Sequence, residues 1–191
     1  MKLLGLTGGI GTGKSTASGL LERRGIPVID TDVLARDLVE PGQSTLAEVV
    51  SAFGRELLDD QGRLRRRALA EIVFSSPDKL RQLEAILHPR IRECWLAQAE
   101  KWRREGRKAA VVVIPLLFET DGQSHFDVVL CTACSAATQR ARLQERGWSD
   151  LQIQQRLAAQ WPLERKMAAS NYVIWTEGDV AVHEQQLAKI F

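Results

Sequence analysis

The stretch Gly8-Gly9-Ile10-Gly11-Thr12-Gly13-Lys14-Ser15 decides the fold of this 191-residue chain. It satisfies the pattern G-x-x-x-x-G-K-[ST], it follows the apolar run Lys2–Leu6, and a helical pattern over Ser15–Arg24 comes after it. In this pattern the glycines let successive backbone N–H groups surround phosphate oxygens, and the start of the helix adds partial positive charge. The sequence therefore predicts a phosphate-binding P-loop between a strand and a helix, with Lys14 reaching the terminal phosphates of a nucleoside triphosphate.

Short apolar runs of β type alternate with longer helical patterns along the rest of the chain. The strand candidates are Lys2–Leu6, Pro27–Ile29, Ala109–Ile114, Asp127–Cys131 and Tyr172–Trp175. Strands separated by helices join through right-handed crossovers and form a parallel sheet covered on both faces. We therefore expect an α/β fold with a doubly wound five-stranded parallel sheet.

Two helical insertions interrupt this pattern. Residues 33–106 read as helix, with a capping box starting at Thr45, and His88 precedes Pro89, where a helix normally breaks. The insertion exceeds what a crossover needs, so we interpret it as a substrate-binding subdomain. Residues 135–169 are rich in Arg, Gln and Glu, include a second capping box at Ser149, and are interpreted as a lid. The remaining segments, 1–32, 107–134 and 170–191, would form the nucleotide-binding core.

Composition excludes several classes of function. Lys and Arg together number 26 and Asp and Glu 24, a formal charge of +2, too near balance for a non-specific coat for nucleic acid or membranes. No apolar run approaches the length of a spanning helix. Cys131 and Cys134 match C-x-x-C, but further metal ligands at suitable spacing are missing, so we interpret them as reduced thiols at a strand end. We expect a cytoplasmic monomer that acts on a small molecule.

The sequence favours a small-molecule kinase of nucleoside-kinase type among P-loop NTPases. The chain has no Asn-Lys-x-Asp motif, which GTPases use to recognise guanine. Motor-type ATPases place an acid at the end of a central strand, whereas Val111–Ile114 ends in Pro115, with Glu119 the nearest acid. Small kinases need a P-loop, a base for the acceptor hydroxyl and a mobile arginine lid.

Asp32 is the candidate base because it follows the second strand, at the sheet edge where doubly wound folds bind ligands. Asp30 shares this edge, and either residue could instead cap the helical segment Val33–Val39. Ser15 and Asp32 are the candidate Mg²⁺ ligands. The lid segment offers a set of candidate arginines, namely Arg140, Arg142, Arg146, Arg156 and Arg165. The separate cluster at residues 63–67 is interpreted as a solvated helix entrance, or as a contact for a phosphate-rich substrate.

Five motifs occur in a characteristic order: Leu6–Thr16 with its Thr-Gly-Gly-Ile opening; Val28–Asp32 with Ala35-Arg36 and Pro41-Gly42; Leu87-His88-Pro89 with Ile91-Arg92; Pro115–Glu119; and Gln139, Arg142-Leu143, Arg146, Arg156 and Gln160. Together they resemble the dephospho-CoA kinase family over nearly the whole chain. The resemblance implies transfer of the ATP γ-phosphate, with Mg²⁺, to the ribose 3′-hydroxyl of dephospho-CoA. The products would be ADP and CoA, in the last step of coenzyme A synthesis.

The resemblance also implies roles for individual residues. The catalytic residues would be Asp32, Lys14 and Arg142. The nucleotide-binding residues would be Gly8, Gly9, Gly11, Thr12, Gly13, Lys14, Ser15, Thr16 and Arg142. The acceptor-binding residues would be Thr7, Asp32, Arg36, His88, Arg92, Leu117, Phe118 and Glu119.

The chain departs from the family pattern near its last strand. Family members commonly read Ala-Asp-x-Val-Ile-x-Asn-x-Gly, but Ser170 and Thr176 stand at the Asp and Asn positions here, and Glu177 follows. Two other functions remain open on the sequence: a different P-loop kinase, such as a nucleoside monophosphate kinase, and a regulatory module that binds nucleotide without turnover.

Overall fold

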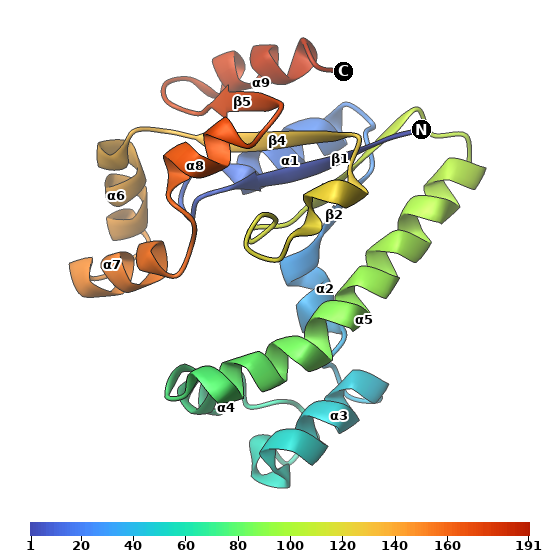
Figure 1. Ribbon diagram of the computed structural model, residues 1–191, viewed down its shortest axis with the longest axis vertical. Coiled ribbons are helices and arrows are strands. Elements are labelled where there is room, and N and C mark those ends of the chain that lie inside the picture. Colours follow the sequence, from blue (N-terminus) through green and yellow to red (C-terminus); the bar gives the residue numbers. More distant parts are fainter. The chain divides into compact units, whose positions relative to one another are not determined.

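A five-stranded parallel sheet with the strand order β2-β3-β1-β4-β5 confirms the predicted doubly wound fold. Figure 1 shows β1 and β4 side by side within it. The computed structural model describes residues 1–191, and the chain divides into two compact units, residues 1–29 with 102–191 and residues 30–101. The strands are β1 (Lys2–Gly8), β2 (Val28–Asp30), β3 (Ala109–Val113), β4 (Val128–Ala133) and β5 (Tyr172–Trp175).

The strand order places β1 at the centre of the sheet, between β3 and β4. Leu6 of β1 is in register with Val113 of β3 and with Leu130 of β4. The chain leaves β1 toward β2 on one side, and it leaves β4 toward β5 on the other. The carboxyl ends of β1 and β4 therefore flank the point where the winding reverses, which is where open α/β sheets bind ligands.

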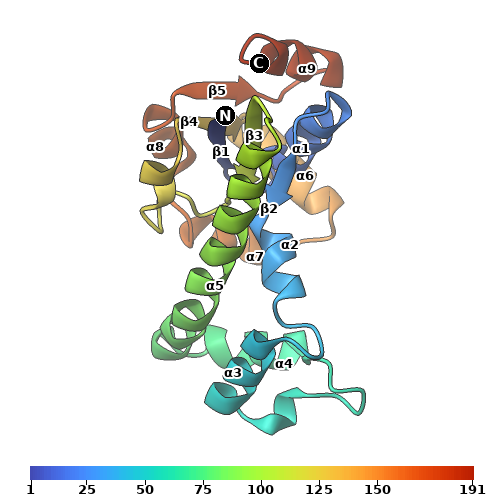
Figure 2. The same cartoon turned by 90° about the vertical axis from the view of Figure 1, so that its right-hand side faces the viewer.

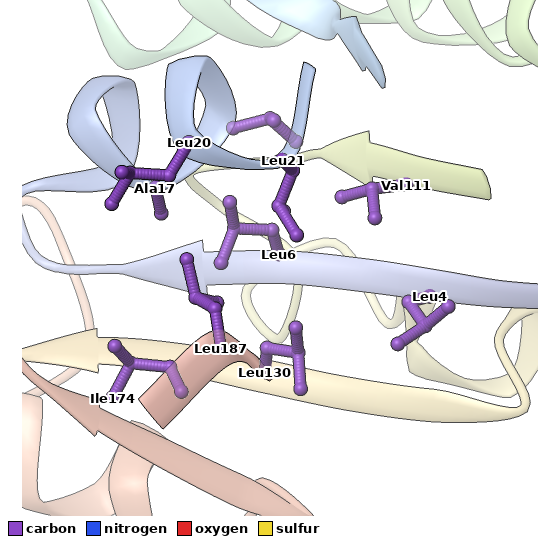
Figure 3. Packing of buried hydrophobic residues seen from close by; sticks show 10 residues of the cluster. Leu4, Leu6, Ala17, Leu20, Leu21, Val111, Leu130, Ile174 and Leu187 are labelled. Carbon is purple, nitrogen blue, oxygen red and sulfur yellow. The ribbon is translucent and has the colours of Figure 1, made fainter. Parts of the chain in front are cut away.

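Helices α1 (Lys14–Arg23) and α9 (Val180–Ala188) cover one face of the sheet. Leu20 and Leu21 of α1 pack against Leu6, and Leu187 of α9 packs beside Leu130 (Figure 3). All five side chains are fully buried. This core anchors the helix that follows the P-loop and so holds the loop in place.

The other face is covered by the segment after β3, which includes the short helix η2 (Gly122–His125), and by α8 (Leu163–Ala168). Phe118 stacks on Trp161 with ring centroids 5.7 Å apart. Helices α6 (Ala136–Glu145) and α7 (Asp150–Ala158) complete the segment between β4 and β5. The predicted capping box of Ser149 and Gln152 at the start of α7 is confirmed.

The second unit, residues 30–101, is helical. Its elements are α2 (Thr31–Asp37), α3 (Ser44–Phe53), η1 (Arg55–Leu57), α4 (Arg66–Phe74) and most of α5 (Pro77–Arg104), which Figure 2 shows as one long helix. Val49, Leu57 and Val73 form a separate core to which α3, η1 and α4 all contribute.

Two local predictions in this unit are wrong. Helix α3 begins at Ser44 after Gln43, so Thr45 lies inside the helix, buried, and does not cap it. Helix α5 continues through Pro89 although proline removes a helical hydrogen bond at a cost of about 3 kcal/mol. Apolar packing on both sides of the proline, by Leu83 toward the α3–α4 core and by the buried Trp95, offsets that cost.

No helix in the chain combines the length and the apolar character needed to cross a membrane.

Candidate active site

The P-loop leaves β1 through a turn that only glycine can make. Gly8 has a φ of 144°, and a Cβ there would lie 2.4 Å from Thr132 Oγ1 on β4. Thr132 Oγ1 also lies 2.9 Å from Thr12 Oγ1, and Thr12 Oγ1 donates to Gly9 O at 2.7 Å. Strand β4 therefore supports the P-loop through Thr132, and this contact keeps the backbone groups of the loop in a fixed arrangement.

The loop ends at Gly13, the N-cap of α1, with a φ of 93°. Glycine has no side chain to cap the helix, and the first turn of α1 contains no acidic residue. The N–H groups of this turn are thus left for an anion, and the helix dipole favours negative charge there. Ser15, in the same turn, is exposed and its hydroxyl makes no hydrogen bond within the protein.

Lys14 lies over its own loop. Its ammonium group donates to Gly8 O at 3.0 Å and to Gly9 O at 2.8 Å. A triphosphate in the loop would offer stronger, charged acceptors. The predicted phosphate contact of Lys14 therefore requires its side chain to exchange these carbonyl partners for phosphate oxygens.

Two glutamines from the segment 135–169 hold one residue of the P-loop, Ile10. Gln139 on α6 donates from Nε2 to Ile10 O at 2.6 Å, and Gln160 accepts from Ile10 N at 3.1 Å. Each glutamine uses one end of its amide, so the N–H and the C=O of Ile10, which belong to two successive peptide groups, are both bound. Residues 135–169 are in this way attached to the phosphate-binding loop.

Arg142 is the lid arginine that hydrogen-bonds to the P-loop region. Its Nη1 donates to Thr176 Oγ1 at 2.9 Å and to Gly11 O at 3.5 Å, and its Nη2 donates to Thr176 O at 2.5 Å. The Thr176 hydroxyl in turn donates to Thr12 O at 2.9 Å. Thr176, which stands where the family that the sequence resembles commonly has Asn, thus connects Arg142 to the P-loop.

The other candidate arginines have other partners. Arg140 pairs with Asp150 at 2.7 Å, Arg156 stacks over Trp148, and Arg165 stacks over the indole of Trp161. Arg146 is exposed at the end of α6. The geometry therefore favours Arg142 among the five.

Glu119 is engaged in a buried ion pair. Its Oε1 lies 2.8 Å from Lys166 Nζ on α8 and accepts from Trp161 N at 2.7 Å. Lys166 is fully buried and also donates to Pro115 O at 2.8 Å. Glu119 Oε2 is buried without a hydrogen-bond partner. In this structure Glu119 holds the segment after β3 against the lid base.

Three further predicted acceptor-binding residues have buried side chains. Thr7 is fully buried and donates from Oγ1 to Pro115 O at 3.2 Å. Leu117 and Phe118 pack in the core on the same sheet face. These three side chains are packed into the core, so they do not face an acceptor. Only the main-chain atoms of these residues are left for such a contact.

The Cys131 and Cys134 thiols are buried at the end of β4 and are free. Burial raises the pKa of Cys131 to about 11 and also raises the pKa of Cys134. Both thiols therefore stay protonated near neutral pH, which makes them poor nucleophiles.

The predicted base, Asp32, lies in the first turn of α2 in the second unit and is exposed. Asp30 is the N-cap of α2, since its Oδ1 accepts from Asp32 N at 2.8 Å. Of the two acids, Asp30 is therefore the capping residue. Asp32 and Arg36 are four residues apart on α2 and share one face.

That face of α2 lines a groove of about 350 Å³ within the second unit. Its polar lining consists of Asp32, Arg36 and Arg66, and its apolar lining includes Leu69, Val73, Leu83 and Leu87. Arg66 is bound to Glu40 at 2.8 Å and to Arg36 O at 3.1 Å. Arg66 was expected either at a solvated helix entrance or at a phosphate contact; it lies at the groove.

His88 and Arg92 lie on α5, one helical turn apart on the same face. Arg92 is exposed, His88 is half-buried, and the two side chains make no hydrogen bond or ion pair within the protein. They are available to a ligand of the second unit, but neither lines the groove.

Sequence reasoning missed Thr132 and Lys166 and assigned no role to Glu177. Lys166 lies in a segment rich in Arg and Glu, where nothing in the sequence indicates that its side chain is buried. Thr132 is a threonine in a strand, which is common and indicates no contact with the P-loop. Their roles depend on partners more than 40 residues away, and only the fold brings those partners together.

Comparison with known proteins identifies the family of the chain. A family model described as dephospho-CoA kinase matches residues 2–181. Dephospho-CoA kinase from Bdellovibrio bacteriovorus is 42% identical over 179 residues, covering 94% of this chain and 89% of the relative. Among solved structures, TT1252 from Thermus thermophilus is 34% identical with a TM-score of 0.86, covering 99% of this chain and 95% of that one. Dephospho-CoA kinase from Campylobacter jejuni is 26% identical with a TM-score of 0.73, covering 98% and 94%. The chain belongs to the dephospho-CoA kinase family.

Proposed function

We propose that this protein transfers the γ-phosphoryl group of ATP to the ribose 3′-hydroxyl of dephospho-CoA, forming CoA and ADP, the last step of coenzyme A synthesis. The observation that carries the proposal is the family match over residues 2–181, which spans both the P-loop and the helical unit of residues 30–101. A glycine-turned loop in front of an uncapped helix supports the triphosphate half of the reaction.

The groove of the second unit supports the acceptor half. Arg36 and Arg66 offer guanidinium groups at a groove whose remaining lining is largely apolar. Dephospho-CoA combines charged phosphates with a long, weakly polar pantetheine arm, so it matches both parts of the lining. His88 and Arg92 would contact the same acceptor from α5.

In the proposed reaction Asp32 accepts the proton of the 3′-hydroxyl as its oxygen bonds to the γ-phosphorus, while the bond to the bridging oxygen of ADP breaks. Lys14 and Arg142 stabilise the charge that spreads over the transferred group and the leaving oxygen. Asp32 is exposed, so it is accessible to an acceptor.

The two predicted Mg²⁺ ligands, one in each unit, are donors of a kind that suits this ion. The Ser15 hydroxyl has no partner within the protein, and an alcohol and a carboxylate are the hard oxygen donors that Mg²⁺ prefers. Ser15 and Asp32 would hold the ion, and the ion would supply positive charge to neutralise the phosphates. The cytoplasmic location and the monomeric state expected from the sequence remain predictions.

A comparison of acceptors tests the proposal. ADP release is measured with dephospho-CoA, AMP, CMP and UMP at equal concentration, with ATP alone as the background. Dephospho-CoA should give the highest kcat/KM, and phosphorus NMR of the product should show a new monoester at the ribose 3′ carbon. Faster turnover on a nucleoside monophosphate would refute the proposed acceptor, and nucleotide binding without turnover would identify a regulatory module.

A further inference from the structure

The turn after β5 contacts helix α6 at its amino end through Glu177. One carboxylate oxygen of Glu177, Oε1, accepts hydrogen bonds from Ser135 N at 3.1 Å, from the Ser135 hydroxyl and from the Thr138 hydroxyl at 2.6 Å. Ser135 is the N-cap of α6, and its own hydroxyl accepts from Thr138 N. A carboxylate at this position also interacts favourably with the helix dipole. Glu177 therefore fixes the amino end of the lid helix.

Glu177 holds this position as an anion. Its other oxygen, Oε2, accepts from Trp175 Nε1 at 3.1 Å. Hydrogen bonds from Ser135 and Thr138 favour the charged form and lower the pKa of Glu177 to about 2. The carboxylate is thus ionised over the whole pH range in which the enzyme would be assayed.

The preceding residue, Thr176, holds the other end of the same helix. Its carbonyl and hydroxyl oxygens accept from the Arg142 guanidinium at 2.5 and 2.9 Å. Ser135 and Arg142 are seven residues apart, which is about 10 Å along a helix axis. Two adjacent residues after β5 therefore bind α6 at both ends, and they fix the height and rotation at which it presents Arg142.

Glu177 is the charged group that hydrogen-bonds to Ser135 and Thr138, and no other charged side chain does so. Arg142 contributes to the pKa shifts of two neighbouring groups, Cys134 and His183. Burial raises the pKa of Cys134 and lowers the pKa of His183, so both are neutral near pH 7. Removing the Glu177 carboxylate would therefore leave the Ser135 amide and the two hydroxyls without a charged acceptor.

We propose that Glu177 is a positioning residue, which sets helix α6 so that Arg142 lies beside the P-loop in the orientation needed for phosphoryl transfer. The inference rests on the proposed role of Arg142 in the reaction. A displacement of about 1 Å in a group that acts on the transition state costs up to about 100-fold in rate. Loss of the Glu177 carboxylate should thus lower kcat by about 10- to 100-fold and leave the KM for dephospho-CoA within twofold.

The test is a double-mutant cycle between Glu177→Ala and Arg142→Ala, measured as kcat with saturating ATP and dephospho-CoA. If Glu177 acts through Arg142, Glu177→Ala should lower kcat in the wild-type background and change it less than twofold in the Arg142→Ala background. Glu177→Gln keeps the volume and one acceptor oxygen, so its kcat should fall between those of the wild type and Glu177→Ala. Glu145→Gln, on the exposed end of the same helix, serves as the matched control and should leave kcat unchanged.

Equal losses from Glu177→Ala in both backgrounds would overturn the proposal, because they would mean that Glu177 acts independently of Arg142. An unchanged kcat for Glu177→Ala would overturn it as well. If Arg142→Ala itself leaves kcat intact, the role of Arg142 is refuted, and amide hydrogen exchange then decides the remaining claim. Glu177→Ala should speed exchange in α6 at least tenfold relative to Glu145→Gln, and equal exchange would show that Glu177 does not fix the helix. Far-UV circular dichroism of each variant identifies any that fails to fold.

Discussion

Replacement of Lys166 by methionine should destabilise the first unit strongly, because it leaves the Glu119 carboxylate buried without its cation. The Lys166 side chain is 0% exposed and that of Glu119 is 15% exposed, and the charged atoms are 2.8 Å apart. Breaking a buried pair by removing one partner costs about 3–5 kcal/mol. For a chain of 191 residues this corresponds to a fall in Tm of about 6–20 °C.

The companion variant separates the charge from the packing. In Lys166→Met/Glu119→Gln no charge is left buried, and Pro115 O still accepts from Thr7 Oγ1. The double variant should therefore recover about 1–3 kcal/mol relative to Lys166→Met alone. Lys189→Met, on the exposed end of the chain, is the matched control and should stay within about 0.5 kcal/mol of the wild type.

The assay is urea unfolding followed by circular dichroism, with hydrogen exchange in β1 and β4 to report on the first unit by itself. A Lys166→Met variant within about 1 kcal/mol of the wild type would refute the reasoning, because the ion pair would then not be desolvated. A double variant as unstable as the sum of the two single variants would also refute it, because the two charges would then be uncoupled.

Three further predictions concern the base, the loop and pH. Asp32→Asn should lower kcat by roughly 10²–10⁴-fold with the Kd for ATP within twofold, measured by ADP release and calorimetry; an unchanged kcat would remove the base assignment. Gly8→Ala should lower the free energy of unfolding in urea by about 1–3 kcal/mol, because its Cβ would clash with Thr132 at a residue with positive φ. At Gly19 the added Cβ meets open space, so Gly19→Ala should stabilise α1 by about 0.5–1 kcal/mol. Equal effects of the two substitutions would contradict the steric argument. Burial lowers the pKa of His183 below its ordinary value of 6.5. When the pH falls below 6.5, His183 is therefore protonated in the unfolded chain but stays neutral in the folded one. Stability should therefore fall as the pH drops from 7.5 to 5, and His183→Gln should flatten that dependence; an unflattened curve would assign the loss to other groups.

The predicted secondary structure agrees with the structure where it depends on residues close together in the sequence. The Gly8–Ser15 stretch specifies a strand, a turn and a helix start through local backbone requirements, and the structure places β1 and α1 on either side of it. The run Tyr172–Trp175 was predicted to the residue, because β-branched and aromatic side chains favour a strand.

The errors arose where distant contacts outweigh local preference. Pro89 favours a helix end, yet α5 passes through it, because apolar residues before the proline are partly buried against the α3–α4 core and Trp95 and Ala99 after it are buried. The pattern at Thr45 fits a capping box, yet burial of its side chain places it within α3.

The sequence by itself determined that this chain has a P-loop on a parallel α/β sheet, because a glycine-rich loop before a helix and buried parallel strands follow from residues close together in the chain. Tertiary structure alone decided that Glu119 pairs with Lys166 and that Thr176 and Glu177 hold the helix bearing Arg142. The physical reason is that these contacts join residues 34 to 47 positions apart, and a polar side chain finds such a partner only after the sheet and its helices have packed.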